Sequence, residues 1–557
     1  MNPYTGKSHG PGQRAATILF GAALIGVFSA LYLSTLAPTV LYFDVPGMFD
    51  PAMLQAAVPV LGIAHPTGYP TYMMIAHLFT YLPFGDEAYR VNLLSAVCGV
   101  AAVVALYLVG LRLTRRAFPA ALGALAFGLT PIFWSQAVIA EVYTLNALFI
   151  AAILYALLLW RDSGRDGHLL LAALLMGLSL THHLTSALLI PVAIIFVAMT
   201  DGSLLRRAGL WLKGAGLFAL GLTPYLYLPV RALMEAPLNE ADPSTPGRFL
   251  LLVSGGSFLL KNLLDISGTT QGSNDGSGGI SGGFWAHAQD TLGRLSPAGE
   301  YVGGQFPALM LVIGAAGFVY LALTDRAAAT LLGVPFAGWT IHAAAYTVED
   351  FYIFFIPAYL IFGLFIAAGA GLVLRAAQSL TARLSARAGT AAVVALCALM
   401  AASPLARASE THAAEDRSGD YFGREVLDTV AAETGPGATV LHHRSALWYM
   451  VLVEQRRRDL TLIDPFETSW VRHTDIVWPD DLTARQSEER YGTGDLSGAS
   501  TARIASQSGP VYLLDREDAY AEGLKEAGFR VETVDEEVGL YELTPENEAA
   551  PGDRRAE

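Results

Sequence analysis

The first 404 residues are dominated by long apolar segments separated by short polar stretches. Eleven of these segments are long enough, or nearly so, to cross the roughly 30 Å hydrocarbon layer of a membrane as helices. They lie approximately at residues 15–37, 91–112, 117–135, 139–160, 168–181, 183–199, 208–229, 304–323, 328–346, 352–374 and 388–404. The apolar run 71–84 is too short to cross, so we expect a helix that lies at the membrane surface. The pattern predicts an α-helical polytopic membrane protein with about eleven spans.

Beyond residue 404 the pattern changes to short, alternating strand-like and helix-like segments. The pattern predicts four strands, ATVLHH, DLTLID, PVYLLD and FRVETV, and a candidate fifth strand, GLYELT. It predicts helices over ALWYMVLVEQ and EDAYAEGLKEAG. We therefore predict a membrane domain over residues 1–404, with outer loops 38–90 and 230–303, and a soluble α/β domain over residues 405–545. The run Arg456–Arg457–Arg458 is interpreted as a solvated helix end, and the tail 546–557 is expected to be disordered.

Composition supports this division and excludes several classes of protein. The chain is 53% hydrophobic and 15% charged, and its net charge of −14 argues against nucleic acid as a partner. Residues 1–403 carry 19 Lys and Arg against 18 Asp and Glu, whereas residues 404–557 carry 16 against 31. Two cysteines, Cys98 and Cys397, lie in apolar runs, which excludes a disulfide framework or a cysteine-rich metal site.

The basic residues predict the orientation of the spans. With the N-terminus in the cytoplasm, 14 of the 19 basic residues of the membrane domain fall in inner loops, as the positive-inside rule requires. An odd number of spans then places the acidic C-terminal domain outside the cytoplasm, whereas a single span over residues 168–199 would place it inside. We expect a multi-pass protein of the cell (inner or plasma) membrane, surrounded by membrane lipid.

With this orientation, a set of ionisable and polar side chains falls on the outer face of the membrane. The set is Asp44, Asp50, His65, Tyr69, His77, Glu141, His182, His183, Arg231, Asp242, Glu349 and Asp350. Structural interpretations stay open for several of them. Glu141 lies where it could cap a helix, and His182 and His183 could be buried core residues. Arg231 could be an interfacial residue whose long side chain reaches the polar headgroup region. Asp86 and Glu87 are interpreted as solvated loop residues without a role.

Acids, an arginine and histidines at a membrane surface suit one kind of chemistry. A carboxylate can take a proton from an acceptor hydroxyl while cations hold a phosphate leaving group, and a lipid-phosphate sugar donor presents its reactive carbon at this depth. The sequence has no G-x-x-x-x-G-K-[ST], no H-E-x-x-H and no G-x-S-x-G motif, and the first outer loop has no D-x-D. No cofactor is indicated, and a divalent cation held by ligands from distant loops stays open. The glycine-rich stretch 268–283 is expected to be a mobile outer loop.

Several segments resemble a family of polytopic membrane proteins whose eukaryotic members are protein O-mannosyltransferases of the GT-C glycosyltransferase superfamily. The specific part is HPTGYP within LGIAHPTGYPTYMMIAHLFTYLPFG, and the likeness continues in RVNLLSAVCG, AEVYTLNALF, the THH region, YLYLPVRA and YTVEDFYIFF. It covers roughly residues 38–465. The family usually places two acids about fifteen residues before its His-Pro. Here the first is Asp50, but the second position is Met53.

The resemblance implies an inverting glycosyltransferase that uses a polyprenyl-phosphate sugar, with mannose as the expected sugar. The expected acceptor is extracytoplasmic, and its identity stays open among protein Ser/Thr hydroxyls, a glycan and a lipid. Asp50 is the expected general base, and Asp44 is the second candidate. The remaining substrate-binding candidates are Arg231, His65 and one of His182 and His183 for the phosphate, Glu141 and Asp350 for the sugar pocket, and Tyr69 and Asp242. Two alternatives stay open: a lipid or solute transporter, and a non-catalytic membrane assembly protein.

Overall fold

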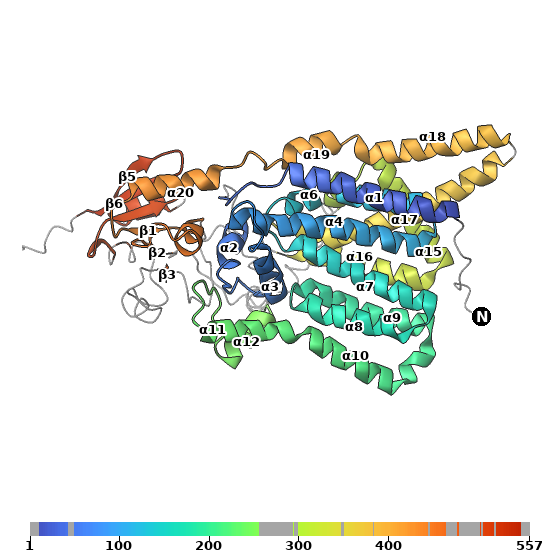
Figure 1. Ribbon diagram of the computed structural model, residues 1–557, viewed down its shortest axis with the longest axis horizontal. Helices are drawn as coiled ribbons and strands as arrows, with labels where there is room; N and C mark the ends of the chain where they lie inside the picture. The colour runs from blue at the N-terminus through green and yellow to red at the C-terminus, as the bar shows by residue number, and fades with distance from the viewer. Residues whose placement is uncertain are drawn as a thin grey trace, which may run out of the picture.

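The computed structural model describes residues 11–42, 50–255, 293, 299–346, 350–382, 384–443, 446–463, 476–477, 502, 505–516 and 520–546. Asp44, Glu349, the glycine-rich stretch 268–283 and nearly all of the tail 546–557 lie outside these residues. Figure 1 shows a bundle of roughly parallel helices with a small sheet at one end. The prediction of a helical polytopic protein with a C-terminal α/β region is confirmed.

The bundle consists of apolar helices that match the predicted segments. They are α1 (Pro11–Ser34), α4 (Glu87–Thr114), α5 (Ala117–Gly128), α6 (Pro131–Ala137), α7 (Tyr143–Ser163), α8 (Asp166–Leu180), α9 (Leu189–Thr200), α10 (Ala208–Gly221), α15 (Ala308–Thr324), α16 (Arg326–Ala345), α17 (Ile356–Thr381) and α18 (Ala386–Leu405). Among the described residues, seven helices are long and apolar enough to span a membrane, or nine if each of two bent pairs forms one span. The predicted spans 168–181 and 183–199 correspond to shorter apolar helices, so eleven spans stays a prediction.

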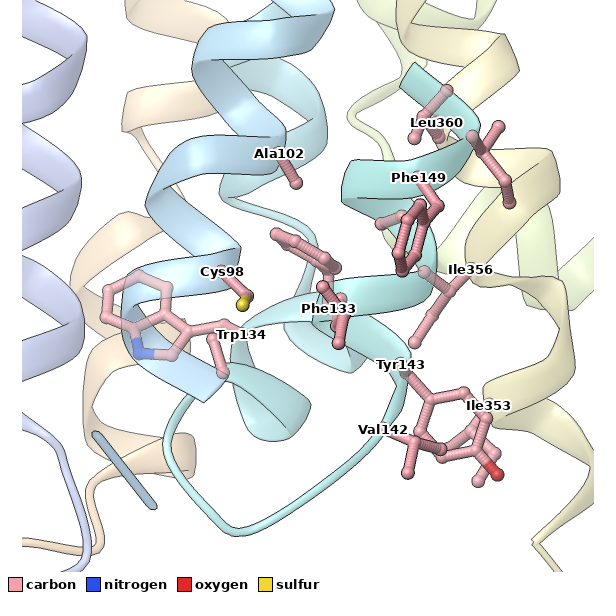
Figure 2. Packing of buried hydrophobic residues seen from close by; sticks show 14 of the residues in the cluster. Cys98, Ala102, Phe133, Trp134, Val142, Tyr143, Phe149, Ile353, Ile356 and Leu360 are labelled. Carbon is pink, nitrogen blue, oxygen red and sulfur yellow. The ribbon is translucent and has the colours of Figure 1, made fainter. Parts of the chain in front are cut away.

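Glycines let the central helices approach one another closely. A Cβ atom at Gly317 of α15 would overlap the carbonyl oxygen of Phe365 on α17, and one at Gly369 would overlap that of Ile313. Small residues at such crossings bring helix backbones into van der Waals contact, which drives association where lipid offers no hydrophobic gain. Figure 2 shows the core beside α17, where bulky apolar side chains of several helices belong to one buried cluster.

Shorter elements cover the end of the bundle nearest the sheet. Two helices, α2 (Asp50–Ala57) and α3 (Pro70–Phe79), lie in the first predicted outer loop, and α3 is the helix expected in the run 71–84. The others are η1 (Leu184–Leu188), η3 (Thr223–Leu226), α11 (Tyr227–Leu233), α12 (Pro246–Val253), η4 (Phe351–Phe355) and α19 (Ala408–Glu415). At the opposite end, η2 (Gly202–Arg206) joins α9 to α10.

The C-terminal region forms a mixed sheet in the order β3-β2-β1-β4-β6-β5. The elements are α20 (Phe422–Glu433), β1 (Thr439–Leu441), η5 (Tyr449–Val453), β2 (Thr461–Ile463), β3 (Ile476–Val477), β4 (Val511–Leu514), α23 (Ala521–Glu526), β5 (Phe529–Asp535) and β6 (Leu540–Pro545). β1 runs parallel to β2 and β4, and the remaining pairs are antiparallel. Each predicted strand is present, whereas the helix expected over ALWYMVLVEQ is a short π-helical turn, η5.

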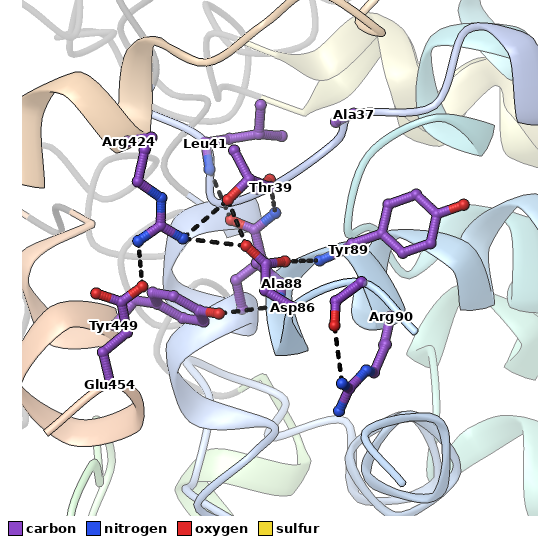
Figure 3. Close-up of polar contacts among 12 residues, drawn as sticks. Ala37, Thr39, Leu41, Asp86, Ala88, Tyr89, Arg90, Arg424, Tyr449 and Glu454 are labelled. Atoms are coloured by element: carbon purple, nitrogen blue, oxygen red, sulfur yellow. Dashed lines mark hydrogen bonds and ion pairs between the residues drawn. The ribbon is translucent and has the colours of Figure 1, made fainter. Parts of the chain in front are cut away.

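An ion-pair network joins the sheet region to the helical bundle (Figure 3). Arg424 of α20 binds Asp86 Oδ2 at 3.0 Å and Thr39 Oγ1 at 2.9 Å, and it also pairs with Glu454. The Tyr449 hydroxyl accepts a hydrogen bond at 3.3 Å from a backbone N–H in the first turn of α4. We call these contacts the Arg424 network. It ties the start of α4 to the C-terminal region.

Candidate functional site

The site begins with an acid and a histidine that the first outer loop brings together. Asp50 is the first residue of α2, and its Oδ2 lies 3.4 Å from Nε2 of His65. The same His65 nitrogen lies 3.2 Å from the Tyr69 hydroxyl, and the His65 side chain is only 10% exposed. Asp50 and His65 therefore form an ion pair when the imidazole is protonated, and they remain neighbours when it is neutral.

Arg231 holds the loop that leads to His65. From α11 its guanidinium donates to the carbonyl of Leu61 at 2.7 Å and to that of Val60 at 3.1 Å. These bonds satisfy polar backbone groups in a largely buried loop, where an unpaired carbonyl is costly. Arg231 thus contacts the backbone before His65 and, among the described residues, takes no direct part in the Asp50–His65 pair.

A distant segment supports the same loop through its backbone. Ile63 forms a parallel bridge with Asn239, and its N–H donates to the Leu238 carbonyl at 2.8 Å. The Ile63 carbonyl in turn accepts the Glu240 N–H at 3.0 Å. The position of His65 therefore depends on a segment more than 170 residues further along the chain.

Two adjacent histidines complete one wall of the site at the end of α8. His182 is fully buried, donates from Nε2 to the Val142 carbonyl at 2.8 Å, and stacks on the Tyr72 ring. His183 lies beside Tyr69, with ring centroids 6.3 Å apart. Tyr69 therefore contacts both the Asp50–His65 pair and the histidine pair.

A hydroxyl pair fastens this wall to the first outer loop. The hydroxyls of Thr71 and Thr181 lie 2.5 Å apart, and the Thr71 N–H donates to the Thr181 carbonyl at 3.3 Å. Thr181 directly precedes the histidine pair, and Thr71 lies in the first turn of α3. The two bonds join α3 to the end of α8.

Burial keeps both histidines neutral at physiological pH. It lowers the pKa of His182 to about 4, because the charged imidazolium would lose its hydration. It lowers the pKa of His183 to about 3, with further contributions from the neighbouring His182, His342 and His65. The Nδ1 atom of His183 accepts the Thr185 N–H at 3.4 Å, so the neutral tautomer carries its proton on Nε2.

Two more carboxyl groups lie within electrostatic reach of Tyr69. Glu141 is 5% exposed and lies in the loop before α7, where its Oε2 accepts the Val142 N–H at 3.2 Å. Burial raises the pKa of the Glu141 carboxyl well above its ordinary value, and the Asp50 carboxylate adds to the rise. Burial likewise raises the pKa of the Tyr69 hydroxyl, with contributions from Asp50, Glu141 and Asp350. Asp350 directly precedes η4.

One predicted binding residue lies in a separate cluster. Asp242 pairs with Arg248 and accepts a hydrogen bond from the Ser244 hydroxyl at 3.0 Å. Its N–H donates to Asn239 Oδ1 at 2.8 Å, so Asp242 belongs to the loop that bridges to Ile63. These contacts join it to the site through that loop.

His77, which the sequence places on the same outer face, makes hydrogen-bonding contacts that support the fold of the first outer loop. It lies on α3, where its Nδ1 is 3.0 Å from the Val58 carbonyl oxygen and its Nε2 is 3.0 Å from the Tyr81 hydroxyl. Both nitrogens are therefore occupied by contacts within the first outer loop.

Aromatic residues that the sequence pattern does not single out line the same region. The Tyr143 ring lies 5.8 Å from that of His183, and Phe354 lies 6.0 Å from His183 and 4.5 Å from Tyr346. A signal for them is present, because all three lie in the segments AEVYTLNALF and YTVEDFYIFF that carry the resemblance. Apolar rings exclude water and strengthen the electrostatic interactions among the polar groups they surround.

The interpretation of Asp86 as a solvated loop residue is wrong. Asp86 caps α4 by accepting the Tyr89 N–H at 2.7 Å, and it binds Arg424. The cap could be read from the sequence, since an aspartate before an apolar helix is a common N-cap. The ion pair could not, because its two partners are distant in the chain.

The interpretation of the arginine run 456–458 as a solvated helix end is wrong for Arg457. Its guanidinium donates to the carbonyls of Ala431, Thr434 and Gly435, and it pairs with Asp459. Arg457 therefore closes the end of α20 by satisfying carbonyl groups that the helix leaves without partners.

The structure shows the surroundings of Met53, which stands where the family usually has its second acid. Met53 lies one turn after Asp50 on α2 and is fully buried in the apolar core. A carboxylate at that position would have to be buried among apolar side chains, at a large desolvation cost. Among the described residues, no group of three or more His, Cys, Asp or Glu side chains has an arrangement that could hold a metal ion.

The helical bundle, the helices of the first outer loop and the C-terminal sheet together define the fold of the GT-C glycosyltransferases. The structure matches ArnT from Cupriavidus metallidurans in the apo state with a TM-score of 0.57 at 15% identity, covering 94% of this chain and 97% of ArnT. It matches the same protein bound to undecaprenyl phosphate with a TM-score of 0.55. The archaeal oligosaccharyltransferase AglB from Archaeoglobus fulgidus matches with a TM-score of 0.50 at 12% identity, covering 96% of this chain and 75% of AglB.

Within this fold class, the sequence is similar to protein O-mannosyl-transferases. Residues 50–205 match the family model described as the protein O-mannosyl-transferase TMEM260 N-terminal domain. The Mus musculus protein O-mannosyl-transferase TMEM260 is 33% identical over 210 residues, which are 36% of this chain and 30% of that protein. The protein of that name from Dictyostelium discoideum is 24% identical over 109 residues, which are 19% of this chain and 13% of that protein.

The resemblance inferred from HPTGYP is therefore confirmed, and the chain is a multi-pass membrane protein with the GT-C fold. The matched part spans less than a third of either curated relative. Much of the candidate site lies within the region of sequence similarity, namely Asp50, His65, Tyr69, Glu141, His182 and His183.

Proposed function

We propose that this protein transfers a sugar, with mannose the favoured candidate, from a polyprenyl-phosphate donor to an extracytoplasmic hydroxyl acceptor, with inversion at the anomeric carbon. The observation that carries the proposal is the Asp50–His65 pair, held beside Tyr69 and the buried Glu141 in a GT-C fold. The names of the relatives support the sugar and a protein acceptor. The undecaprenyl phosphate bound to ArnT supports a lipid-linked donor.

In this proposal Asp50 is the general base. Its carboxylate takes the proton of the acceptor hydroxyl as that oxygen attacks the anomeric carbon of the donor. The new carbon–oxygen bond forms on the face opposite the phosphate, the bond from the anomeric carbon to the phosphate oxygen breaks, and polyprenyl phosphate leaves. One displacement on the opposite face inverts the configuration. Asp44 keeps its place as the second candidate for the base.

The histidines act on the phosphate in this proposal. His65 orients the Asp50 carboxylate and, when protonated, adds positive charge for the leaving phosphate. His183 carries its proton on Nε2 and can donate it to a phosphate oxygen, because its Nδ1 is an acceptor for Thr185. Arg231, the other candidate for the phosphate, takes the supporting role of fixing the loop before His65.

The remaining side chains form the pocket for the sugar in this proposal. Glu141 and Asp350 bind sugar hydroxyls, and the rings of Tyr69 and Tyr143 exclude water. A protonated Glu141 can both donate and accept a hydrogen bond, which suits a hydroxyl partner.

The proposed orientation places this reaction outside the cytoplasm. The N-terminus and the basic loops face the cytoplasm, and the candidate site and the C-terminal region face the opposite side of the cell membrane. Protease treatment of spheroplasts tests this arrangement, because it should cut the C-terminal region while leaving the loop between α9 and α10 intact. Protection of the C-terminal region would overturn it.

The decisive experiment compares wild-type protein with Asp50→Asn in membranes supplied with a radiolabelled polyprenyl-phosphate mannose. The wild type should label protein, glycan or lipid acceptors. Asp50→Asn should lower the transfer rate by about 10²–10⁴-fold, the range that a general base contributes. Asp201→Asn is the matched control, since Asp201 is exposed at the opposite end of the bundle and should leave the rate unchanged.

Three results would contradict the proposal. Wild-type transfer rates in a folded Asp50→Asn protein would remove Asp50 from the role of base. A product that retains the donor's anomeric configuration, measured by NMR, would exclude a single displacement. Movement of the labelled donor across vesicles without any transfer would instead identify a transporter.

A further inference from the structure

An apolar groove, separate from the candidate functional site, lies toward the end of the bundle opposite the sheet. A groove of about 220 Å³ runs between α8, α9 and α10 and is lined by apolar side chains, among them Leu169, Met176, Ile190, Val197, Leu210 and Phe218. An apolar cavity of about 150 Å³ already binds a molecule of benzene. The groove lies toward the ends of α9 and α10 that η2 connects, whereas the histidine pair follows the other end of α8.

The packing of α8 against α10 explains why the groove is open. At one level the two helices touch through their backbones, because a Cβ atom at Gly177 would overlap the carbonyl oxygen of Phe218. One turn toward η2 the contact loosens, and a Cβ at Gly214 would lie 3.9 Å from that of Ala173. Trp211 lines the end of the groove nearest η2, which we call its mouth, and its indole N–H donates to the Leu204 carbonyl of η2 at 3.0 Å. This bond fixes the ring at the mouth of the groove.

Basic side chains lie on the elements that form this mouth. Arg165, Arg206 and Lys213 are exposed, and none of the three side chains has an ion-pair partner within the described part of the chain. A fourth, Arg207, is neutralised by Asp166, with which it forms two hydrogen bonds of 3.0 and 2.5 Å. Arg165 directly precedes α8, Arg206 ends η2, and Lys213 lies in the first two turns of α10. Uncompensated positive charge therefore accompanies the apolar groove.

We propose that this groove binds one acyl chain of an anionic phospholipid, with the phosphate headgroup held by Arg206, Lys213 and Arg165. Both parts of the site agree with this occupant. The groove offers an apolar lining for a hydrocarbon chain, and its mouth carries exposed positive charge. Basic pockets between membrane helices are typical binding sites for anionic lipid headgroups.

The test is lipid binding by the purified full-length protein, measured by native mass spectrometry with phosphatidylglycerol and phosphatidylcholine of the same acyl chains. Wild-type protein should retain phosphatidylglycerol more strongly. The double variant Arg206→Gln/Lys213→Gln should weaken that binding by about 25-fold, since each basic residue near the surface contributes about fivefold. Arg326→Gln is the matched control, because Arg326 is exposed at the start of α16, outside the groove, and should leave binding unchanged.

A second variant tests the groove itself. Gly214→Leu places a larger side chain in the space beside Ala173 and should reduce phosphatidylglycerol binding while the basic residues remain. Equal retention of the two lipids by the wild type would overturn the proposal, as would unchanged binding in the double variant. Preferential binding of a polyprenyl phosphate in this groove, detected by competition, would overturn it as well.

Discussion

The Arg424 network and the Asp50–His65 pair both join acids to a base near the end of the bundle that carries the sheet, and they differ in the kind of base. In the Arg424 network the cation is a guanidinium, which keeps its charge at every physiological pH. In the candidate site the partner of Asp50 is His65, whose charge depends on pH and surroundings. The acids are buried to a similar degree, since Asp50 is 24% exposed and Asp86 is 29% exposed, whereas the bases differ, since His65 is 10% exposed and Arg424 is 26% exposed.

The burial of the acid therefore does not separate the structural ion pair from the pair that we propose to be reactive. Arg424 forms hydrogen bonds with side chains from three different segments, so it holds these segments together. The Asp50–His65 pair lies beside Tyr69, whose hydroxyl is within electrostatic reach of two further carboxyl groups. Several carboxyl groups therefore lie near one histidine, which is the arrangement that the proposed acid–base chemistry uses.

The largest effect on stability is expected from breaking the Arg424 network. Arg424→Ala leaves the half-buried Asp86 carboxylate without its cation and removes one of the two arginines that pair with Glu454, the other being Arg456, so it should lower the free energy of unfolding by about 2–3 kcal/mol. Thermal unfolding in detergent measures this. Arg530→Ala is the control, because the Arg530–Glu532 pair is exposed and should change stability by less than about 0.5 kcal/mol. Equal effects of the two variants would contradict a structural role for the network.

Acid should destabilise the folded protein through the two buried histidines of the site. An unfolded histidine titrates near pH ~6.5, whereas folded His182 and His183 have pKa values of about 4 and about 3. Between these values the unfolded chain binds protons that the folded chain does not, so stability should fall as pH falls from about 7 toward about 4. His182→Gln should flatten the dependence of the melting temperature on pH. His168→Gln, in an exposed contact with Ser163, should leave it unchanged, and identical slopes in the two variants would refute the assignment.

A smaller effect is expected where two hydroxyls join α3 to α8. Thr71→Val removes the bond to the Thr181 hydroxyl, while Thr181 keeps its bond to the Leu178 carbonyl. The expected loss is about 1 kcal/mol of unfolding free energy. Thr324→Val is the control, since the Thr324 hydroxyl is exposed and bonds within its own helix. A Thr71→Val protein as stable as the control would show that this contact does not hold the site together.

The smallest effect is expected from making Glu141 permanently neutral. Its raised pKa favours the protonated carboxyl, which glutamine imitates in size and hydrogen bonding. Under the proposed function, Glu141→Gln should change the rate of sugar transfer by less than about threefold, under ~1 kcal/mol of barrier. Glu141→Ala, which removes the polar group, should cost more. A large loss in Glu141→Gln would mean that the ionised carboxylate takes part in the reaction.

Much of the fold could be predicted from the sequence because its signals are local. A segment in a membrane must satisfy its own backbone, so apolar length alone indicates the helices. The period of the C-terminal segments likewise indicates β1, β2, β4, β5 and β6. The exception, η5, lies in a continuous apolar run, where periodicity does not distinguish one kind of turn from another.

The sequence predicted which residues belong to the candidate site better than it predicted how they are arranged. The orientation of the spans and the HPTGYP segment were enough to select Asp50, His65 and the histidine pair as candidates. They did not indicate that Arg231 binds backbone carbonyls before His65, or that aromatic rings from α7 and η4 stand beside His183. These contacts depend on how segments far apart in the chain pack against one another.

The sequence by itself determined the class of the molecule through its apolar helices, its acidic C-terminal region and the HPTGYP segment that carries the family resemblance. Only the tertiary structure decided which charges meet, because the partner of Asp86 is Arg424, 338 residues away, and no local pattern encodes such a pair. Local rules report which residues face an apolar environment. The chemistry of a buried polar group depends on the neighbours that packing brings to it.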